Sequence, residues 1–366
     1  MKRRLLAAAL RHIRGRPESD QGLSLDQPGG GQGWHAARAS PLGGKIAAMR
    51  GALLGLIAMV LATLQLGACG GAPTSTCGAT GARPHPEIGG ELLYYCGDWP
   101  TVNGGLYLLD VRSGRVRALT SDLAWNLDGA WSPDGTMIAF QSTRDGHDDL
   151  FVMNVDGGGV RKLTDGRGWN EYPSWSPDGQ WITFNSNRDG IAGSGETGYY
   201  RDLYMMRADG SGIRRLTQQA GANTEAAWRP DGSTLAFQSD RAGTWDIYTM
   251  ELDGSSLRQL THHENAGFPR WSPDDSRVVF EAGPPSGPAS IYWLTVGQDG
   301  LHRVTSSESG PYGDIYPDWS PDGRWIVFTR SHSGGDQLFA VRPDGSDLTQ
   351  LTDGPGYKDL PRWRPV

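Results

Sequence analysis

The chain has 366 residues with 53 glycines, 23 prolines and 14 tryptophans, a composition typical of many short strands joined by tight turns. Hydrophobic residues make up 37% and charged residues 20%, so a large core is expected and global disorder is excluded. Outside residues 1–68 the chain carries 25 basic and 38 acidic residues, a net charge of −13. Such a surface repels phosphate backbones, which argues against a nucleic acid ligand.

The N-terminal region has the pattern of an export signal. Residues 1–48 are basic, glycine-rich and irregular, and we expect them to be disordered and to lie upstream of the true start at Met49. An organelle transit peptide is the alternative. Residues 49–68 contain Arg50 followed by an uncharged apolar run, the pattern of a secretory signal that is too short for a confident membrane span.

The signal ends in Leu66-Gly67-Ala68-Cys69, which resembles the lipobox of bacterial lipoproteins. The resemblance implies a lipid on Cys69 and anchoring to a membrane, whereas a cleaved soluble form and an uncleaved anchor are the alternatives. The remaining cysteines, Cys77 and Cys96, would meet oxidising conditions after export, so a disulfide between them is expected, with two free thiols as the alternative. Residues 69–90 are expected to be a linker.

An internal repeat predicts the fold. A tryptophan followed by a Pro-Asp turn recurs at Trp131, Trp175, Trp228, Trp271 and Trp319, with successive spacings of 44, 53, 43 and 48 residues, and Trp363 follows after 44. Each unit reads as four strands: one that ends at the tryptophan, a wholly apolar second strand, a third strand with a central aromatic, and a fourth strand after an Asp-Gly turn. Periods of 40 to 50 residues with four strands each predict the blades of a β-propeller.

The two ends of the repeat region complement each other. Residues 91–120 match the second, third and fourth strands of a unit, and residues 360–366 match a first strand with nothing after it. We therefore predict an all-β, six-bladed propeller over residues 91–366, in which the C-terminal strand completes the first blade and closes the ring.

The repeated unit, with its Trp-Ser-Pro-Asp-Gly turn, resembles the WD40-like propeller repeat of the TolB family over residues 91–366. The resemblance implies a cell-envelope scaffold that binds a protein or peptide. TolB itself is a soluble periplasmic protein with a separate α/β domain ahead of its propeller. Only about 20 residues separate Cys69 from the first blade here, so a role in the Tol–Pal system is not carried over. One membrane-anchored copy, facing the periplasm or the cell exterior, is expected.

Loops that lead into the first strands surround one mouth of the predicted channel. They carry Trp125, Trp169 and Lys358, and the candidate binding residues are Asn126, Asp128, Asn170, Glu171, Asn223, Glu225, Asp314 and Asp359. Converging carboxylates there would hold a divalent cation or a basic peptide segment, with no other cofactor expected. The plainer interpretation is that these Asn and Asp residues cap the loops through their own backbone.

Two further features lie on the same side of the repeat. Arg144, Arg188, Arg241 and Arg330 occupy related positions and are expected to form a structural ladder that pairs with neighbouring blades. Residues 191–200 extend the loop of one blade and include Tyr199 and Tyr200, which would suit contact with a partner; a tolerated insertion is the alternative.

Enzyme signatures are weak. The sequence has no Gly-x-Ser-x-Gly elbow, P-loop or HExxH motif. His262-His263-Glu264 is a poor metal site because adjacent side chains rarely converge on one ion. A pair of carboxylates across the channel would be needed for glycosidic chemistry. We therefore expect a binding protein, with a small-ligand or cation-binding propeller and, after it, a hydrolase as the alternatives.

Overall fold

A computed structural model describes residues 77, 82–98, 103–120, 124–189, 201–218, 221–262, 264–284, 287–306, 312–332 and 334–366. These residues belong to one unit that runs from Ser75 to Val366. The predicted signal peptide, Cys69 and the loop with Tyr199 and Tyr200 lie outside the described residues. Among the residues described, no helix is long and apolar enough to cross a membrane.

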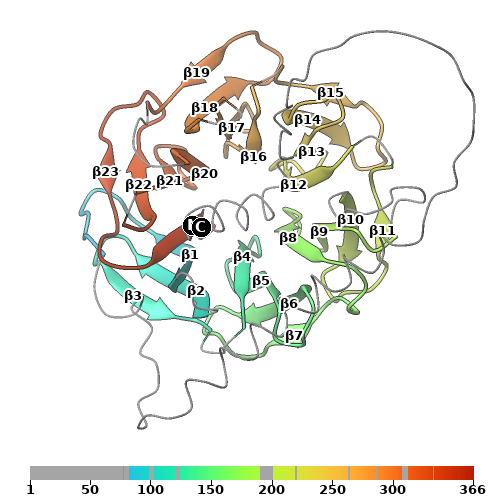
Figure 1. Cartoon of the computed structure of the whole chain (residues 1–366), viewed down its shortest axis with the longest axis horizontal. Coiled ribbons are helices and arrows are strands. Elements are labelled where there is room, and N and C mark those ends of the chain that lie inside the picture. Colours follow the sequence, from blue (N-terminus) through green and yellow to red (C-terminus); the bar gives the residue numbers. More distant parts are fainter. Residues whose placement is uncertain are drawn as a thin grey trace, which may run out of the picture. The chain divides into compact units, whose positions relative to one another are not determined.

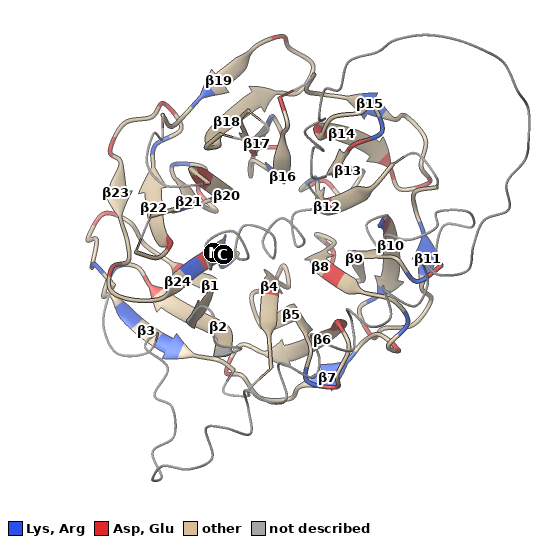
Figure 2. Ribbon diagram, in the orientation of Figure 1, with Lys and Arg blue, Asp and Glu red and all other residues tan. Residues whose placement is uncertain are grey.

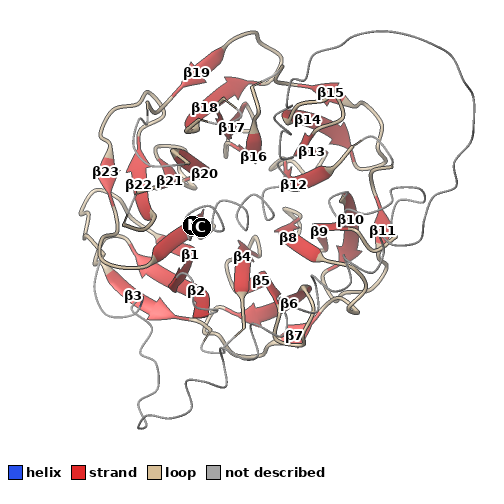
Figure 3. Cartoon of the chain, in the orientation of Figure 1, coloured by secondary structure: helices blue, strands red, loops and turns tan. Residues whose placement is uncertain are grey.

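The described chain forms six antiparallel four-stranded sheets arranged as blades around a centre, which confirms the predicted propeller (Figures 1 and 3). Blade 1 contains β1 (Glu91–Asp98), β2 (Asn103–Asp110), β3 (Arg115–Ala118) and β24 (Tyr357–Trp363). Blade 2 contains β4 (Asn126–Trp131), β5 (Met137–Ser142), β6 (Asp149–Asn154) and β7 (Arg161–Lys162). Blade 3 contains β8 (Asn170–Trp175), β9 (Trp181–Ser186), β10 (Asp202–Arg207) and β11 (Arg214–Arg215).

The remaining blades repeat the same order. Blade 4 contains β12 (Asn223–Trp228), β13 (Thr234–Ser239), β14 (Asp246–Glu251) and β15 (Arg258–Gln259). Blade 5 contains β16 (Gly267–Trp271), β17 (Arg277–Ala282), β18 (Ser290–Thr295) and β19 (Leu301–Arg303). Blade 6 contains β20 (Asp314–Trp319), β21 (Ile326–Arg330), β22 (Gln337–Val341) and β23 (Thr349–Gln350). The first strand of each blade is the innermost one (Figure 1).

The turn between the first and second strands explains why the Ser-Pro-Asp-Gly motif recurs. In blade 3 the Ser176 hydroxyl donates to Asp178 at 2.5 Å and accepts the backbone N–H of Trp181 at 2.9 Å. The hydrogen bond from Ser176 holds the pKa of Asp178 below its usual value. Gly179 follows with a φ of +69°, a conformation that strains a residue with a Cβ atom. Each residue of the motif therefore has a separate task in the turn.

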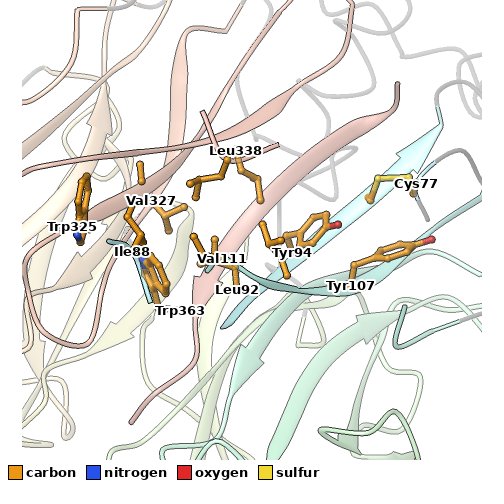
Figure 4. Packing of buried hydrophobic residues seen from close by; sticks show 14 residues of the cluster. Cys77, Ile88, Leu92, Tyr94, Tyr107, Val111, Trp325, Val327, Leu338 and Trp363 are labelled. Atoms are coloured by element: carbon orange, nitrogen blue, oxygen red, sulfur yellow. A yellow bond between two sulfur atoms is a disulfide. The ribbon is translucent and has the colours of Figure 1, made fainter. Parts of the chain in front are cut away.

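The C-terminal strand closes the ring as predicted. β24 pairs with β1 in antiparallel register, with Trp363 opposite Leu92 and Lys358 opposite Cys96. The core at this joint combines Leu92 and Tyr94 of blade 1 with Trp325 and Leu338 of blade 6, as Figure 4 shows. Two neighbouring blades thus share one packed interface across the join between the chain ends.

Part of the predicted linker belongs to this joint. Ala82 forms a β-bridge with Thr352, and the Arg83 N–H donates to the carbonyl oxygen of Leu351 in blade 6 at 2.7 Å. Ile88 is buried in the core of the joint. A disulfide connects Cys77 with Cys96 of β1. The chain ahead of β1 therefore binds to the last blade before it enters the first.

Candidate functional site

The four candidate residues that begin the first strands are buried structural groups. Asn126, Asn170, Asn223 and Asp314 have no exposed surface. The Asn170 Oδ1 atom accepts hydrogen bonds from Arg188 at 2.8 Å and from Ser186 at 2.9 Å, and the same pattern recurs in blades 2 and 4. In blade 6, Asp314 accepts two hydrogen bonds from Arg330, at 2.6 and 2.8 Å. These residues hold arginines inside the blades and do not reach the rim.

The arginine ladder is structural, and its hydrogen bonds run within blades, while Arg188 also forms a 4.0 Å ion pair with Asp165, which follows β7 of the neighbouring blade 2. Arg188 lies over the rings of Phe184 and Tyr204 of its own blade, at 5.2 and 5.5 Å from their centroids. A second connection to the preceding blade comes from the asparagine. The Asn170 Nδ2 atom donates to Asp149 Oδ1 of blade 2 at 3.2 Å. The repeat spacing predicted that the arginines occupy equivalent positions, but it did not predict which residues they contact.

A bulge interrupts every first strand at the same place. The register with the second strand shifts there in all six blades. In each bulge one residue other than glycine adopts a φ between +51° and +60°. These residues are Asp128, Tyr172, Glu225, Phe268, Tyr316 and Leu360. This backbone region costs about 1 kcal/mol or more for such residues. Strain repeated in register around a channel marks the bulges as the place to look for function.

Four of the six bulge residues form an apolar plug. The rings of Phe268 and Tyr316, from adjacent blades, meet edge to face with centroids 4.4 Å apart. Tyr172 reaches Phe268 from blade 3 at 5.7 Å. Leu360 of blade 1 packs against the same cluster. Side chains from four blades therefore meet at the middle level of the channel, which we call the middle tier.

The other two bulge residues are acids on one wall of the middle tier. Asp128 accepts a hydrogen bond from the Tyr172 backbone, and burial raises the pKa of its carboxyl to about 8. Glu225 Oε2 accepts the Phe268 N–H at 3.2 Å, and burial raises the pKa of Glu225 well above its usual value, with Glu281 adding repulsion. Burial thus favours the protonated acid in both groups, and for Asp128 this form prevails at neutral pH.

The mouth above the plug carries Glu171, which precedes the bulge of β8, and Asp359, which precedes that of β24. The guanidinium of Arg201 pairs with the Glu171 carboxylate at 2.8 Å and lies over the ring of Trp169, 5.7 Å from its centroid. Trp169 is 38% exposed. Asp359 is half-buried, and the neighbouring Lys358 donates to the carbonyl oxygen of Pro355 at 2.7 Å. The mouth therefore presents one exposed aromatic held by an ion pair.

A lower tier lies between the plug and the tryptophans that end the first strands. Its members are Ala130, Ser174, Ala227, Arg270, Asp318 and Arg362. Burial lowers the pKa of Arg270 to about 9 and lowers that of Arg362, and each arginine repels the other. Asp318 accepts the Trp363 N–H at 2.9 Å. The charged half and the small-residue half of this tier face each other across the channel.

Sequence reasoning named Asp128, Glu171, Glu225 and Asp359 but missed the plug and the lower tier. A signal for both exists in the chain. All four plug residues are followed by proline, one further residue and tryptophan. The segments are Tyr172-Pro-Ser-Trp, Phe268-Pro-Arg-Trp, Tyr316-Pro-Asp-Trp and Leu360-Pro-Arg-Trp. Reading these positions as a column would have grouped the aromatics and the arginines.

The described residues contain no group of three or more His, Cys, Asp and Glu side chains that could hold a metal ion. At the predicted His262–Glu264 segment, the Glu264 carboxylate accepts the backbone N–H of His262 at 2.5 Å. His263 lies outside the described residues. The carboxylate of this segment is thus engaged by its own loop.

Comparisons with known proteins identify a family model and a relative that match parts of this chain. The family model described as the TolB β-propeller domain matches residues 95–194 and 191–268. An uncharacterised protein of Agrobacterium fabrum is 37% identical over 83 residues, which are 23% of this chain and 27% of that protein. The chain thus spans about a quarter of the curated relative that it matches.

Solved structures show the same fold at low identity. TolB from Acinetobacter baumannii superposes with a TM-score of 0.67 at 23% identity, over 76% of this chain and 67% of that one. A protein assigned as TolB in Agrobacterium tumefaciens gives 0.58 at 20% identity, over 76% of this chain and all of that one. An oligogalacturonate lyase in complex with manganese gives 0.51 at 18% identity, over 76% and 78%. The fold is therefore shared by enzymes and other proteins, and function must be argued from the site.

Proposed function

Because the TolB β-propeller family model matches residues 95–268, we propose that the chain is an exported, lipid-anchored binding protein without catalytic activity, which engages a protein or peptide at the channel mouth. The scaffold is that of the family. Export is supported by the apolar run before Cys69 and by the Cys77–Cys96 disulfide, since disulfides persist in oxidising compartments. The lipid anchor rests on the lipobox resemblance at Leu66–Cys69.

The observation that carries the binding role is Trp169 at the mouth. A large exposed aromatic is a frequent anchor of protein interfaces when its surroundings hold it in place. Here the backbone N–H of Trp169 donates to Asn187 Oδ1 at 2.7 Å, which holds the main chain, and Arg201 lies over the ring while it pairs with Glu171. The ring is thus fixed before a partner arrives, which reduces the entropy lost on binding.

The same geometry argues against the alternatives. A divalent cation needs deprotonated ligands, whereas burial raises the pKa of Asp128 to about 8 and raises that of Glu225 well above its usual value. Glycosidic chemistry needs one carboxylate that is ionised beside an acid. Because burial favours the protonated form of both bulge acids, we include neither a resident metal nor a hydrolase in the proposal.

Affinity capture from cell-envelope extracts of the natural host tests the proposal. The anchored wild-type chain, a Trp169→Ala variant and a Leu257→Ala variant are compared under the same conditions. Leu257 is the matched control because it is exposed, at 48%, and lies beside the outer strand β15 away from the mouth. We expect a partner that the wild type and Leu257→Ala retain and that Trp169→Ala loses by at least about tenfold. Equal retention by all three, or no partner at all, would overturn the proposal.

A further inference from the structure

The lower tier places one residue from each blade at a single level. After the bulge, the register of each first strand with its neighbour resumes at the residue before the tryptophan. The pairs are Ala130 with Ala139, Ser174 with Thr183, Ala227 with Ala236, Arg270 with Val279, Asp318 with Val327 and Arg362 with Leu93. Because the six blades are equivalent, their side chains surround one cross-section of the channel.

This cross-section is divided into two unequal halves. Blades 2, 3 and 4 contribute Ala130, Ser174 and Ala227, which reach little beyond the backbone. Blades 5, 6 and 1 contribute Arg270, Asp318 and Arg362, which are long and charged. The short side chains therefore face the two guanidiniums across this cross-section. Along the channel, the plug of Phe268 and Tyr316 lies on one side of this level, and the Pro-Asp-Gly turns lie on the other.

The two guanidiniums have donors to spare. Among the described residues, the hydrogen bonds that they form run from Arg270 Nη1 to the carbonyl oxygen of Pro269 and from Arg362 Nη1 to that of Pro361, each at 2.8 Å. These short local bonds orient each plane and leave the remaining N–H groups for another acceptor. Both side chains are half-buried rather than sealed.

The charges of the lower tier also favour the binding of an anion. Asp318 lies on the strand between those of the two arginines, and its carboxylate already accepts the Trp363 N–H. The other acids that act on both arginines are Asp128 and Glu225 of the middle tier, and burial raises the pKa of both, which weakens the negative charge that they offer. Two guanidiniums therefore share one carboxylate.

We propose that the lower tier is a binding site for a carboxylate group, entered from the face of the Pro-Asp-Gly turns and held by Arg270 and Arg362. A planar guanidinium matches a carboxylate with two parallel hydrogen bonds. The carboxylate belongs either to a small organic acid or to the C-terminus of a peptide, with its apolar part under the Phe268–Tyr316 plug. This site goes beyond the proposed function, which concerns the opposite mouth and Trp169.

Calorimetric titration of the full-length chain with succinate tests the proposal, with sodium chloride at equal ionic strength as the reference. Two short peptides of the same sequence, one with a free and one with an amidated C-terminus, separate the two sources of the carboxylate. We expect saturable binding of succinate or of the free-ended peptide, and no binding of the amidated one. A response to succinate that chloride reproduces would overturn the proposal.

Variants locate the site. Arg270→Gln and Arg362→Gln should each weaken carboxylate binding by at least about tenfold, because each removes one charge-assisted pair. Arg324→Gln is the matched control, since Arg324 is exposed and belongs to a turn of the same face outside the channel. If a glutamine variant does not fold, Arg270→Lys and Arg362→Lys keep the charge but not the planar pair, and should still weaken binding. Unchanged affinity in folded variants would sink the assignment.

The experiment also distinguishes this site from the mouth. Trp169→Ala should leave carboxylate binding unchanged, because the plug separates Trp169 from the lower tier. Loss of carboxylate binding in Trp169→Ala would instead place the anion at the mouth and overturn the lower-tier assignment. Loss of the envelope partner in that variant, with carboxylate binding intact, supports both proposals independently.

Discussion

Asn170 shows why an amide, and not a carboxylate, begins three of the first strands. Its oxygen accepts hydrogen bonds from Arg188 and Ser186 within blade 3, while its nitrogen donates to Asp149 of blade 2. A carboxylate could not donate in this way. Where Asp314 takes the position in blade 6, it forms an ion pair with Arg330 instead. One residue type thus serves contacts within and between blades.

Replacing Arg188 tests this arrangement. Arg188→Ala removes the hydrogen bonds to Asn170 and Ser186 and the contact with two aromatic rings, so we expect the free energy of unfolding to fall by about 2–4 kcal/mol. Urea unfolding followed by tryptophan fluorescence measures the change. Arg167→Ala, an exposed arginine of the preceding loop, is the control and should change stability by less than about 0.5 kcal/mol. Equal effects of the two substitutions would contradict the structural role of the ladder.

Asp128 should make stability depend on pH. Its pKa rises from 3.8 in the unfolded chain to about 8 in the fold because of burial. Between these values the folded state binds more protons, so its free energy of unfolding falls as pH rises. Asp128→Asn removes this term and keeps a residue that tolerates a positive φ. Between pH 5 and 8 the variant should lose less stability than the wild type, by up to about 1.4 kcal/mol per pH unit.

Urea unfolding at pH 5, 6.5 and 8 measures that slope for both chains. Glu87→Gln, which changes an exposed carboxylate, serves as the control and should follow the wild type. Parallel stability curves for wild type and Asp128→Asn would show that the Asp128 carboxyl titrates normally.

At the scale of elements, the outermost strands are short but well connected. β7 and β11 contain two residues each, and their arginines reach the next blade. Arg161 donates to the carbonyl oxygen of Ala208 at 2.8 Å, and Arg117 of β3 donates to that of Val155 at 3.0 Å. Figure 2 shows the basic residues gathered on these outer strands. The arginines of the outer strands therefore join neighbouring blades, because their guanidinium groups donate to backbone carbonyl oxygens there.

Removing the end of β24 tests the closure of the ring. A chain truncated after Leu360 loses Trp363, which pairs with Leu92 and packs in the joint between blades 1 and 6. Loss of a buried tryptophan alone costs about 3–5 kcal/mol, and the truncation also exposes an edge of β1. We expect a chain that unfolds at much lower temperature or aggregates, as thermal unfolding and light scattering would show. Removal of Val366 alone is the control, and equal thermal stability of both chains would refute closure by β24.

The strands and the ring closure could be predicted because each appears in the sequence as a pattern that recurs from blade to blade. The tryptophans fix the blade count, and the apolar second strands such as Val278–Phe280 identify the buried layer. The bulges leave a weaker mark, because Asp128, Tyr172 and Leu360 share a backbone conformation but no side-chain chemistry, and a proline follows the bulge residue in only four of the six blades. The candidate residues Asn126 and Asp314 were placed at a rim because sequence spacing cannot tell a buried strand start from an exposed loop.

For the molecule as a whole, anchoring makes a separate prediction. Cys69→Ser removes the thiol that the lipobox resemblance assigns to the lipid. We expect the variant to leave the membrane fraction, while its propeller keeps the unfolding temperature of the wild type because Cys69 lies outside the described fold. Cell fractionation and radiolabelling with palmitate measure the two effects. Membrane association that persists in Cys69→Ser would contradict the anchor, and Glu87→Gln, which changes an exposed side chain and leaves every cysteine in place, is the control.

The Cys77–Cys96 disulfide also determines how the fold would respond to mechanical force. Tension applied from the N-terminal side passes through the sulfur atoms to β1 and bypasses residues 78–95 between the cysteines. It enters at Cys96, which lies between Lys358 of β24 and Gly105 of β2. The load therefore acts along hydrogen-bonded strands on both sides, in shear, and does not peel Ala82 and Arg83 from blade 6. A reduced chain would be pulled open from that weaker edge first.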